Sequence, residues 1–186
     1  MKRSLGLAIF GFLAVMVAGI GLLVSPAGAA TPYCGITWGS LAKQTGQGPG
    51  FPPTPLVAVS AGEHLCYDRL VFELDGPTAG YSVRYAPVLT EGRGLPVSLR
   101  GGASLDIALF APTSDLNGVP TFTPADPANI VNVNGFRTFR QVADGGSFEG
   151  YTTIGLGVRA RLPFRVFVLS GPGYHSRVVI DVAHRW

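Results

Sequence analysis

Short segments in which apolar and polar residues alternate dominate the chain beyond residue 55. Within residues 67–74, Leu70 and Phe72 fall on one face of an extended chain, whereas Arg69 and Glu73 fall on the other. Alternation with a period of two predicts a β-strand that buries one face. The predicted strands are 56–60, 67–74, 81–85, 104–111, 130–133, 137–143, 151–159, 164–169 and 177–183.

Residues that favour turns and loops separate the predicted strands. Asn-Gly, Asp-Gly-Gly and Gly-Pro-Gly sequences predict turns at 134–135, 144–146 and 171–173. Residues 44–55 are rich in Gly and Pro, and residues 112–129 in Pro, Asp, Asn and Thr, so both are expected to be irregular loops. The pattern predicts an all-β fold: a single-domain antiparallel β-sandwich or partly open barrel, after an N-terminal signal segment.

Two of the predicted strands echo each other. Each places an Arg four residues before an acid, Arg69 before Glu73 and Arg177 before Asp181. If the two strands are antiparallel neighbours, Arg69 meets Asp181 and Arg177 meets Glu73, and such cross-strand pairs help to fix the register. The common composition of strands explains the echo equally well.

The first 30 residues have the features of a signal peptide. Lys2 and Arg3 form a positive start, residues 5–24 form a continuous run of apolar residues and glycines, and residues 27–29 are the small residues that a signal peptidase reads. We expect cleavage after this site, in which case the exported protein is secreted. The alternative is an uncleaved anchor, because an apolar run of this length is just enough to span a bilayer.

The basic character of the chain comes mostly from this segment. The whole chain has 14 Lys and Arg against 11 Asp and Glu, and loss of Lys2 and Arg3 leaves 12 against 11. The remaining sequence has no basic run, which argues against nucleic acid as a partner and against electrostatic docking to a membrane. Membrane contact is therefore expected only through the N-terminal segment, if it is retained.

The two cysteines, Cys34 and Cys66, both follow the predicted signal peptide. An even pair in an exported chain predicts a disulfide, here one that ties the N-terminal segment to the first long strand. A free catalytic thiol is the alternative, and an oxidising compartment disfavours it.

Residue patterns for catalysis or metal binding are not apparent. The histidines, His64, His175 and His184, are scattered and lack the spacing of metal ligands. No serine lies in the strand-turn-helix sequence of a hydrolase, and no phosphate-binding loop occurs. We therefore predict no catalytic residue, no metal, no cofactor and no enzyme activity.

Arg and aromatic residues interleave in the later strands and suggest a binding surface. Aromatic rings stack on sugars, and guanidinium groups bind carboxylates through paired hydrogen bonds. The alternative is that the rings form the core and the Arg side chains are merely solvated. The candidate binding residues are Arg137, Arg140, Tyr151, Arg159 and Arg161.

The positions of these arginines along their strands set two further expectations. Arg137 and Arg140 have opposite strand parity, so both are exposed only if a bulge intervenes or the strand lies at an edge. Arg159 and Arg161 share parity and are expected to project together.

The order and spacing of several segments resemble the AMIN-like proteins of actinobacteria, over about residues 34–186. The segments that carry the resemblance are 67–76, 80–85, 135–140, 146–150, 155–167 and 176–181. The family is named for its likeness to the AMIN domain, the targeting module of cell-wall amidases and secretins. The resemblance implies a β-sandwich that holds partners at the envelope by contacting peptidoglycan, and it assigns no role to individual residues.

The predicted organisation is a signal peptide at 1–30, an N-terminal segment with a Pro/Gly-rich loop at 31–55, and an AMIN-like β domain at 56–186. Two functions remain open. The protein is either a non-catalytic, cell-wall-associated module that binds cell-wall (peptidoglycan) glycan or peptide, or a structural protein whose sheet edges bind another exported envelope protein.

Overall fold

The computed structural model describes residues 32–186, so the predicted signal peptide lies outside the described residues. Apart from one turn of 3-10 helix, η1 (Tyr33–Gly35), the described residues form strands and loops, and none of them belongs to a helix that could cross a bilayer. The strands are β1 (Lys43–Thr45), β2 (Leu56–Glu63), β3 (Tyr67–Leu74), β4 (Tyr81–Tyr85), β5 (Ala103–Leu109), β6 (Phe139–Phe148), β7 (Tyr151–Val158), β8 (Phe164–Ser170) and β9 (Ser176–Ala183).

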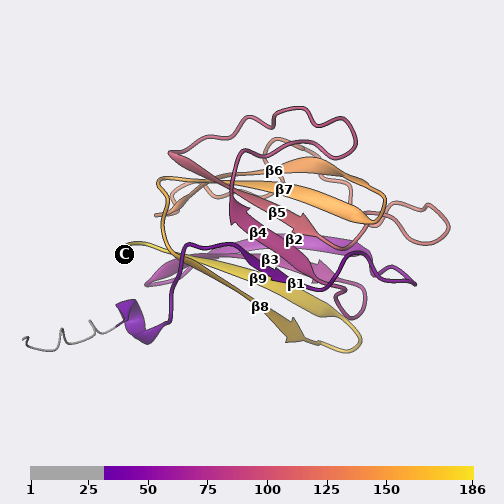
Figure 1. Cartoon of the computed structure of the whole chain (residues 1–186), viewed down its shortest axis with the longest axis horizontal. Helices are drawn as coiled ribbons and strands as arrows, with labels where there is room; N and C mark the ends of the chain where they lie inside the picture. The colour runs from indigo at the N-terminus through magenta and orange to yellow at the C-terminus, as the bar shows by residue number, and fades with distance from the viewer. Residues whose placement is uncertain (1–31) are drawn as a thin grey trace, which may run out of the picture. The chain divides into compact units, whose positions relative to one another are not determined.

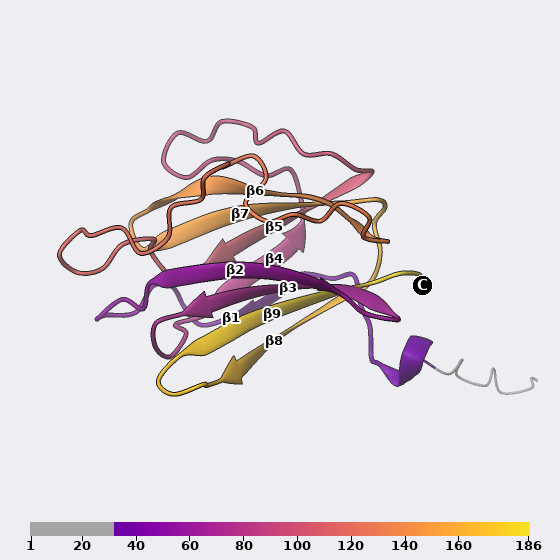
Figure 2. The same cartoon turned by 180° about the vertical axis from the view of Figure 1, so that it is seen from behind.

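The strands form two antiparallel sheets that pack face to face (Figures 1 and 2). One sheet has four strands in the order β2-β3-β9-β8, and the other has five in the order β1-β4-β5-β7-β6. The predicted all-β class is confirmed. Because the strands fall into two separate sheets, the fold is the β-sandwich and not the partly open barrel.

The register of β3 and β9 at the centre of the four-stranded sheet is the one that the sequence echo predicts. Arg69 lies opposite Asp181, and Glu73 lies opposite Arg177. Arg69 and Asp181 form an ion pair, whereas the carboxylate of Glu73 contacts Nδ1 of His175 at 2.8 Å. The predicted neighbours are therefore confirmed, and one of the two predicted ion pairs forms.

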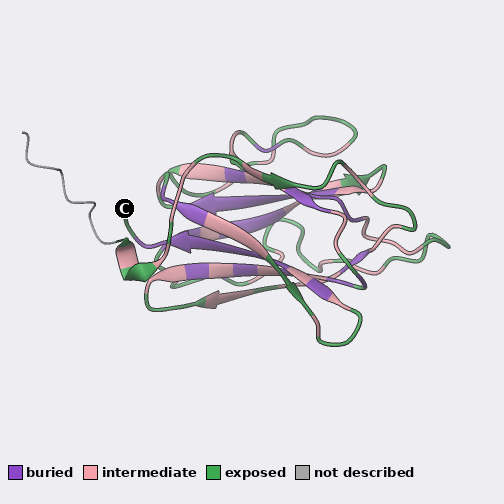
Figure 3. Ribbon diagram, turned by 60° about the horizontal axis from the view of Figure 1, so that its bottom comes forward, coloured by how far each residue is buried: buried purple, intermediate pink, exposed green. Residues whose placement is uncertain are grey.

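The core lies between the sheets and consists of every second residue of the central strands (Figure 3). Burial of a large apolar side chain stabilises the fold by about 1.5–3 kcal/mol, which makes these inward faces the main source of stability. The fully buried core residues include Leu70, Phe72, Val83, Leu105, Ile107, Ile154, Leu156, Phe164, Val178, Ile180 and Val182.

The outer face of the five-stranded sheet is covered by residues 86–102, named here the cover segment, which Figure 1 shows above β6 and β7. Close approach is possible because β7 has glycines on this face. A Cβ at Gly157 would overlap the carbonyl oxygen of Arg100, and one at Gly155 would lie 2.8 Å from a methyl group of Leu99. These glycines allow backbone and side chains to pack directly on the sheet.

The turn predicted at 144–146 is wrong, because β6 continues through these residues with a bulge between Asp144 and Gly146. Gly146 has a φ of 92°, which lets the strand absorb the extra residue. The hairpin turns instead at Glu149 and Gly150, both with positive φ.

Two further segments differ from the prediction. The strand predicted at 130–133 does not form: the N–H of Ile130 donates to the carbonyl of Val142, but the segment otherwise consists of a bend and irregular backbone. Conversely, β1 extends into the 44–55 region that is predicted to be irregular, and it pairs with β4. An edge strand of 3 residues is too short to show alternation.

Candidate functional site

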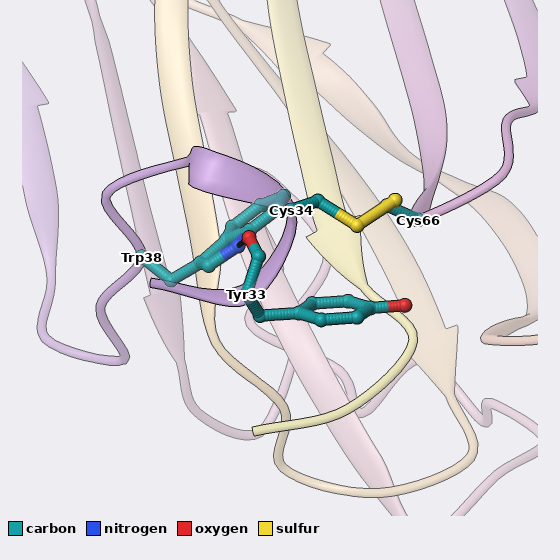
Figure 4. Close-up of a disulfide and its surroundings, with 4 residues drawn as sticks. All are labelled: Tyr33, Cys34, Trp38 and Cys66. Atoms are coloured by element: carbon teal, nitrogen blue, oxygen red, sulfur yellow. Dashed lines mark hydrogen bonds between the residues drawn. A yellow bond between two sulfur atoms is a disulfide. The ribbon is translucent and has the colours of Figure 1, made fainter. Parts of the chain in front are cut away.

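The predicted disulfide between Cys34 and Cys66 is confirmed, and it anchors the N-terminal segment at the start of β3 (Figure 4). The bridge closes a sequence separation of 32 residues. Beside it, the indole N–H of Trp38 donates to the carbonyl of Tyr33 at 2.8 Å, which fixes the ring within the η1 turn region. Disulfides of this kind are typical of extracytoplasmic proteins.

The anchored segment then runs along the edge of the four-stranded sheet. The N–H of Phe164, at the start of β8, donates to the carbonyl of Gly39 at 2.7 Å. The ring of Trp38 lies 6.0 Å from the ring of Tyr67 on β3. The disulfide and this backbone contact together place an aromatic ring at the outer face of the sheet.

A buried carboxylate lies at the centre of that outer face. Asp181 is fully buried on β9, and β3 and β8 bring Arg69 and Arg165 to it from either side. Arg69 donates two hydrogen bonds to the two carboxylate oxygens, at 2.7 and 2.9 Å. Arg165 donates through Nε at 2.8 Å, with a second guanidinium nitrogen at 2.7 Å.

Aromatic rings surround the two guanidinium groups. The guanidinium carbon of Arg165 lies 5.6, 5.4 and 5.0 Å from the ring centroids of Trp38, Tyr67 and Phe167. That of Arg69 lies 5.2 Å from Tyr67 and 5.4 Å from Phe167. We name this group of six residues the Asp181 cluster: Trp38, Tyr67, Arg69, Arg165, Phe167 and Asp181.

The Asp181 cluster carries two cations for one anion. The hydrogen bond to Asp181 raises the pKa of Arg69, so its guanidinium stays protonated at any physiological pH. The Arg69 and Arg165 side chains remain 23% and 32% exposed, whereas Asp181 is inaccessible. A ligand can therefore reach the positive charge and the ring edges but not the internal carboxylate, and a ligand carboxylate would balance the excess charge.

The cluster belongs to a strongly basic end of the sandwich, the end at which Figure 1 marks the C-terminus. The pairing of Tyr67 with Ala183, together with the end of β7 and the start of β6, brings these arginines from different strands to one place. Although the sequence beyond the N-terminal segment is nearly neutral, the fold therefore concentrates positive charge at this end. The basic residues at this end are Lys43, Arg69, Arg84, Arg100, Arg137, Arg140, Arg159, Arg161, Arg165 and Arg185, against Glu63, Asp68, Asp106 and Asp181.

The two predicted residues near the start of β6 lie at the basic end. β6 is the edge of its sheet, and the register shifts between Phe139 and Gln141, so both conditions for exposing Arg137 and Arg140 are met. Arg137 pairs with the exposed Glu63 at 3.2 Å. Arg140 is half-buried and donates to neighbouring backbone carbonyls, which leaves it less free to bind a ligand.

Of the other three predicted residues, Arg159 and Arg161 also lie at the basic end, where the backbone N–H of Arg159 donates to the carbonyl of Thr138 at 2.9 Å. β7 ends at Val158, so Arg159 and Arg161 lie beyond the strand and diverge, and the expectation that they project together is wrong. Arg159 donates to the carbonyl of His184, whereas Arg161 lies over the ring of Tyr85.

Tyr151 lies at the opposite end of β7 from these arginines. It packs edge-on against Phe110, with the ring centroids 5.5 Å apart. The structure therefore brings four of the five predicted binding residues, Arg137, Arg140, Arg159 and Arg161, to the basic end and leaves Tyr151 at the far end of β7.

The basic end also contains a buried aspartate with a structural role. Asp68 accepts hydrogen bonds from the backbone N–H groups of Thr138 and Phe139 at 2.6 and 2.9 Å, and it contacts Nε2 of His184 at 2.9 Å. These contacts tie β3 to the start of β6 and so join the two sheets. Within residues 32–186, no three or more His, Cys, Asp or Glu residues lie close enough to hold a metal ion.

Sequence reasoning missed most of the Asp181 cluster. Its one available signal was the echo that pairs Arg69 with Asp181, which predicts a register contact and not a binding site. Arg165 carries no such signal, because its position depends on β8 pairing with the far side of β9.

The fold and this face define a class: a small β-sandwich module with an open cationic and aromatic face. The sequence matches the family model of the AMIN-like domain over residues 54–184, and the chain belongs to the AMIN-like family. This confirms the resemblance seen in the sequence. A search of curated proteins found no match. A search of solved structures also found none.

Proposed function

We propose that the protein is an exported, non-catalytic module of the cell envelope that binds peptidoglycan through the Asp181 cluster. Membership of the AMIN-like family supports a cell-wall partner. The disulfide between Cys34 and Cys66 supports an extracytoplasmic location.

The observation that carries this proposal is the excess positive charge between aromatic rings on an open sheet face. Peptidoglycan combines sugar rings with peptides that bear free carboxylates. Arg165 and Arg69 bind such a carboxylate through the guanidinium N–H groups that Asp181 does not use. The half-buried ring of Trp38 beside Arg165 offers a surface on which a sugar packs, whereas the ring of Tyr67 is stacked by His64 with the centroids 4.7 Å apart.

Buried Asp181 holds the two guanidinium groups in place before a ligand arrives. Pre-organised donors lose less conformational entropy on binding than free surface arginines do. Because the guanidinium groups remain partly exposed, binding weakens as the salt concentration rises.

Sedimentation with purified, protein-free peptidoglycan tests the proposal. Arg165→Gln removes one cation of the cluster, and Arg93→Gln is the matched control, because Arg93 is exposed on the cover segment away from the cluster. Loss of charge-assisted hydrogen bonds worth roughly 1.5–3 kcal/mol should weaken retention by about tenfold or more in Arg165→Gln alone. Equal retention of both variants, with folding verified by circular dichroism, would reject the cluster as the binding site.

One observation favours a second candidate function, binding of an exported protein at a sheet edge. Beyond the bridge from Phe164 to Gly39, β8 pairs among the described residues only with β9, and its exposed Val168 and Leu169 are 38% and 37% accessible. An open edge with apolar side chains can accept a strand from a partner. Retention only on envelopes that keep their proteins, abolished by Leu169→Lys, would favour this function over peptidoglycan binding.

A further inference from the structure

A shallow apolar hollow of about 460 Å³ lies beside the Asp181 cluster, between the end of β4 and the cover segment. Its walls are mainly aliphatic and proline side chains, and Arg161 is the cationic residue that lines it. This volume lies in the range of sites for small molecules. The hollow is lined by Tyr85, Pro87, Val88, Pro96, Val97 and Arg161, among others.

The aromatic side of the hollow is rigidly built. The hydroxyl of Tyr85 donates to the carbonyl of Leu162 at 2.7 Å and accepts from the N–H of the same residue at 3.0 Å. The ring also packs edge-on against Phe164, with the centroids 5.6 Å apart. The ring of Tyr85 is therefore held in one orientation without a ligand.

Arg161 is positioned on this ring and retains binding capacity. Its guanidinium carbon lies 4.8 Å from the centroid of Tyr85, and its closest polar contact is the carbonyl of Ser40 at 3.4 Å. Among the described residues, no carboxylate forms an ion pair with Arg161. A cation–π contact orients the plane of the guanidinium and leaves its N–H edge free for a carboxylate.

We infer that this hollow, the Arg161 pocket, binds the free C-terminal carboxylate of a short aliphatic peptide. Arg161 receives the carboxylate, and small apolar side chains of the peptide pack against Pro87, Pro96 and Val97, which are exposed or half-buried. The pocket and the cluster are adjacent, because residues 38–40 run from Trp38 at the cluster to the Ser40 carbonyl at Arg161. The inference extends the proposed function by naming the C-terminal end of a peptide as a ligand. It rests on the proposed function only in taking peptidoglycan as the source of that peptide.

The test is a titration of the isotopically labelled protein with acetyl-Ala-Ala of either chirality and with the matching peptide amides, followed by NMR. Wild type should bind at least one free acid about tenfold or more tighter than its amide. Arg161→Gln should bind acid and amide equally, and Arg93→Gln should behave as wild type. The resonances of Val88 and Val97 should shift when the free acid is added to the wild-type protein.

Three results would each overturn the inference: no binding of any probe, equal binding of acid and amide by wild type, or preserved discrimination in Arg161→Gln. The peptide titration is independent of peptidoglycan retention. If the peptide titration fails while Arg165→Gln still weakens peptidoglycan retention, only the inference about the Arg161 pocket is rejected. If Arg165→Gln leaves peptidoglycan retention unchanged while the wild type still prefers the free acid to the amide, only the Asp181 cluster is rejected as a binding site.

Discussion

The two sheets of the sandwich close their outer faces in different ways. On the five-stranded sheet, the cover segment lies directly on β7, where Gly155 and Gly157 leave room for its backbone and side chains. On the four-stranded sheet, side chains of the sheet itself cover the central strand, and Arg69 and Arg165 shield Asp181.

The difference explains why the candidate binding face lies on the smaller sheet. Backbone packed on glycines hides the sheet and exposes the ordinary polar surface of a loop. Side chains packed on a buried carboxylate keep their charges and rings at the surface in fixed positions. The stability of the five-stranded face therefore depends on glycines, which have no side chain, on β7. The stability of the four-stranded face depends on the ion pairs around Asp181.

Removal of the buried carboxylate should have the largest effect on stability. Asp181→Ala leaves two neighbouring cations without their shared anion, and we expect a loss of about 3–5 kcal/mol in the free energy of unfolding. The matched control is Asp106→Ala on the outer face of the other sheet, where the partner Arg84 is 59% exposed. That loss should stay below about 1 kcal/mol. Urea unfolding of both variants checks this, and similar losses would remove the proposed distinction between the faces.

Loss of the disulfide should come next. Cys34→Ser/Cys66→Ser opens a loop that spans 32 residues, and we expect a loss of roughly 3–4 kcal/mol on the chain-entropy account. Because the bridge anchors Trp38 beside the Asp181 cluster, peptidoglycan retention should also fall at temperatures where the variant remains folded. Thermal unfolding measures the loss of stability, and sedimentation with peptidoglycan, well below the variant's midpoint of unfolding, measures the loss of retention. Unchanged retention would show that Trp38 is positioned without the bridge.

A pair of glycine substitutions should show a smaller difference in stability between the two outer faces. Gly157→Ala places a Cβ against the backbone carbonyl of Arg100, and displacement of the cover segment should cost about 1–3 kcal/mol. Gly62→Ala lies opposite Arg69 on the other outer face, and its Cβ would meet only the end of the His64 side chain at 3.8 Å. Its unfolding free energy should change by less than about 0.5 kcal/mol or rise slightly. Chemical denaturation compares the two, and equal losses would contradict the close packing of the cover segment.

The sequence predicts much of the fold because most strands bury one face. Alternation at 67–74 and 81–85 gives β3 and β4 with their observed bounds. The turn assigned to 144–146 fails because a glycine with positive φ serves a bulge as well as a turn. Local patterns carry no information on this choice.

The candidate binding face was harder to predict from the sequence, since it depends on contacts between distant strands. Arg69 and Asp181 are separated by 112 residues, and Arg165 reaches the same carboxylate from a third strand. The composition beyond the predicted signal peptide is close to neutral, yet the fold gathers most of those arginines at one end. Exposed arginines such as Arg137 are visible in the sequence, whereas a buried carboxylate that organises others is visible only in the fold.

The central claim is that the Asp181 cluster contacts peptidoglycan, and NMR of the labelled protein with soluble peptidoglycan fragments tests it most directly. The account predicts that the indole N–H of Trp38 and the Nε–H groups of Arg69 and Arg165 shift on titration. The Nε–H of Arg93 on the cover segment should not shift. Saturable binding that leaves the resonances of Trp38, Arg69 and Arg165 unchanged would contradict the account.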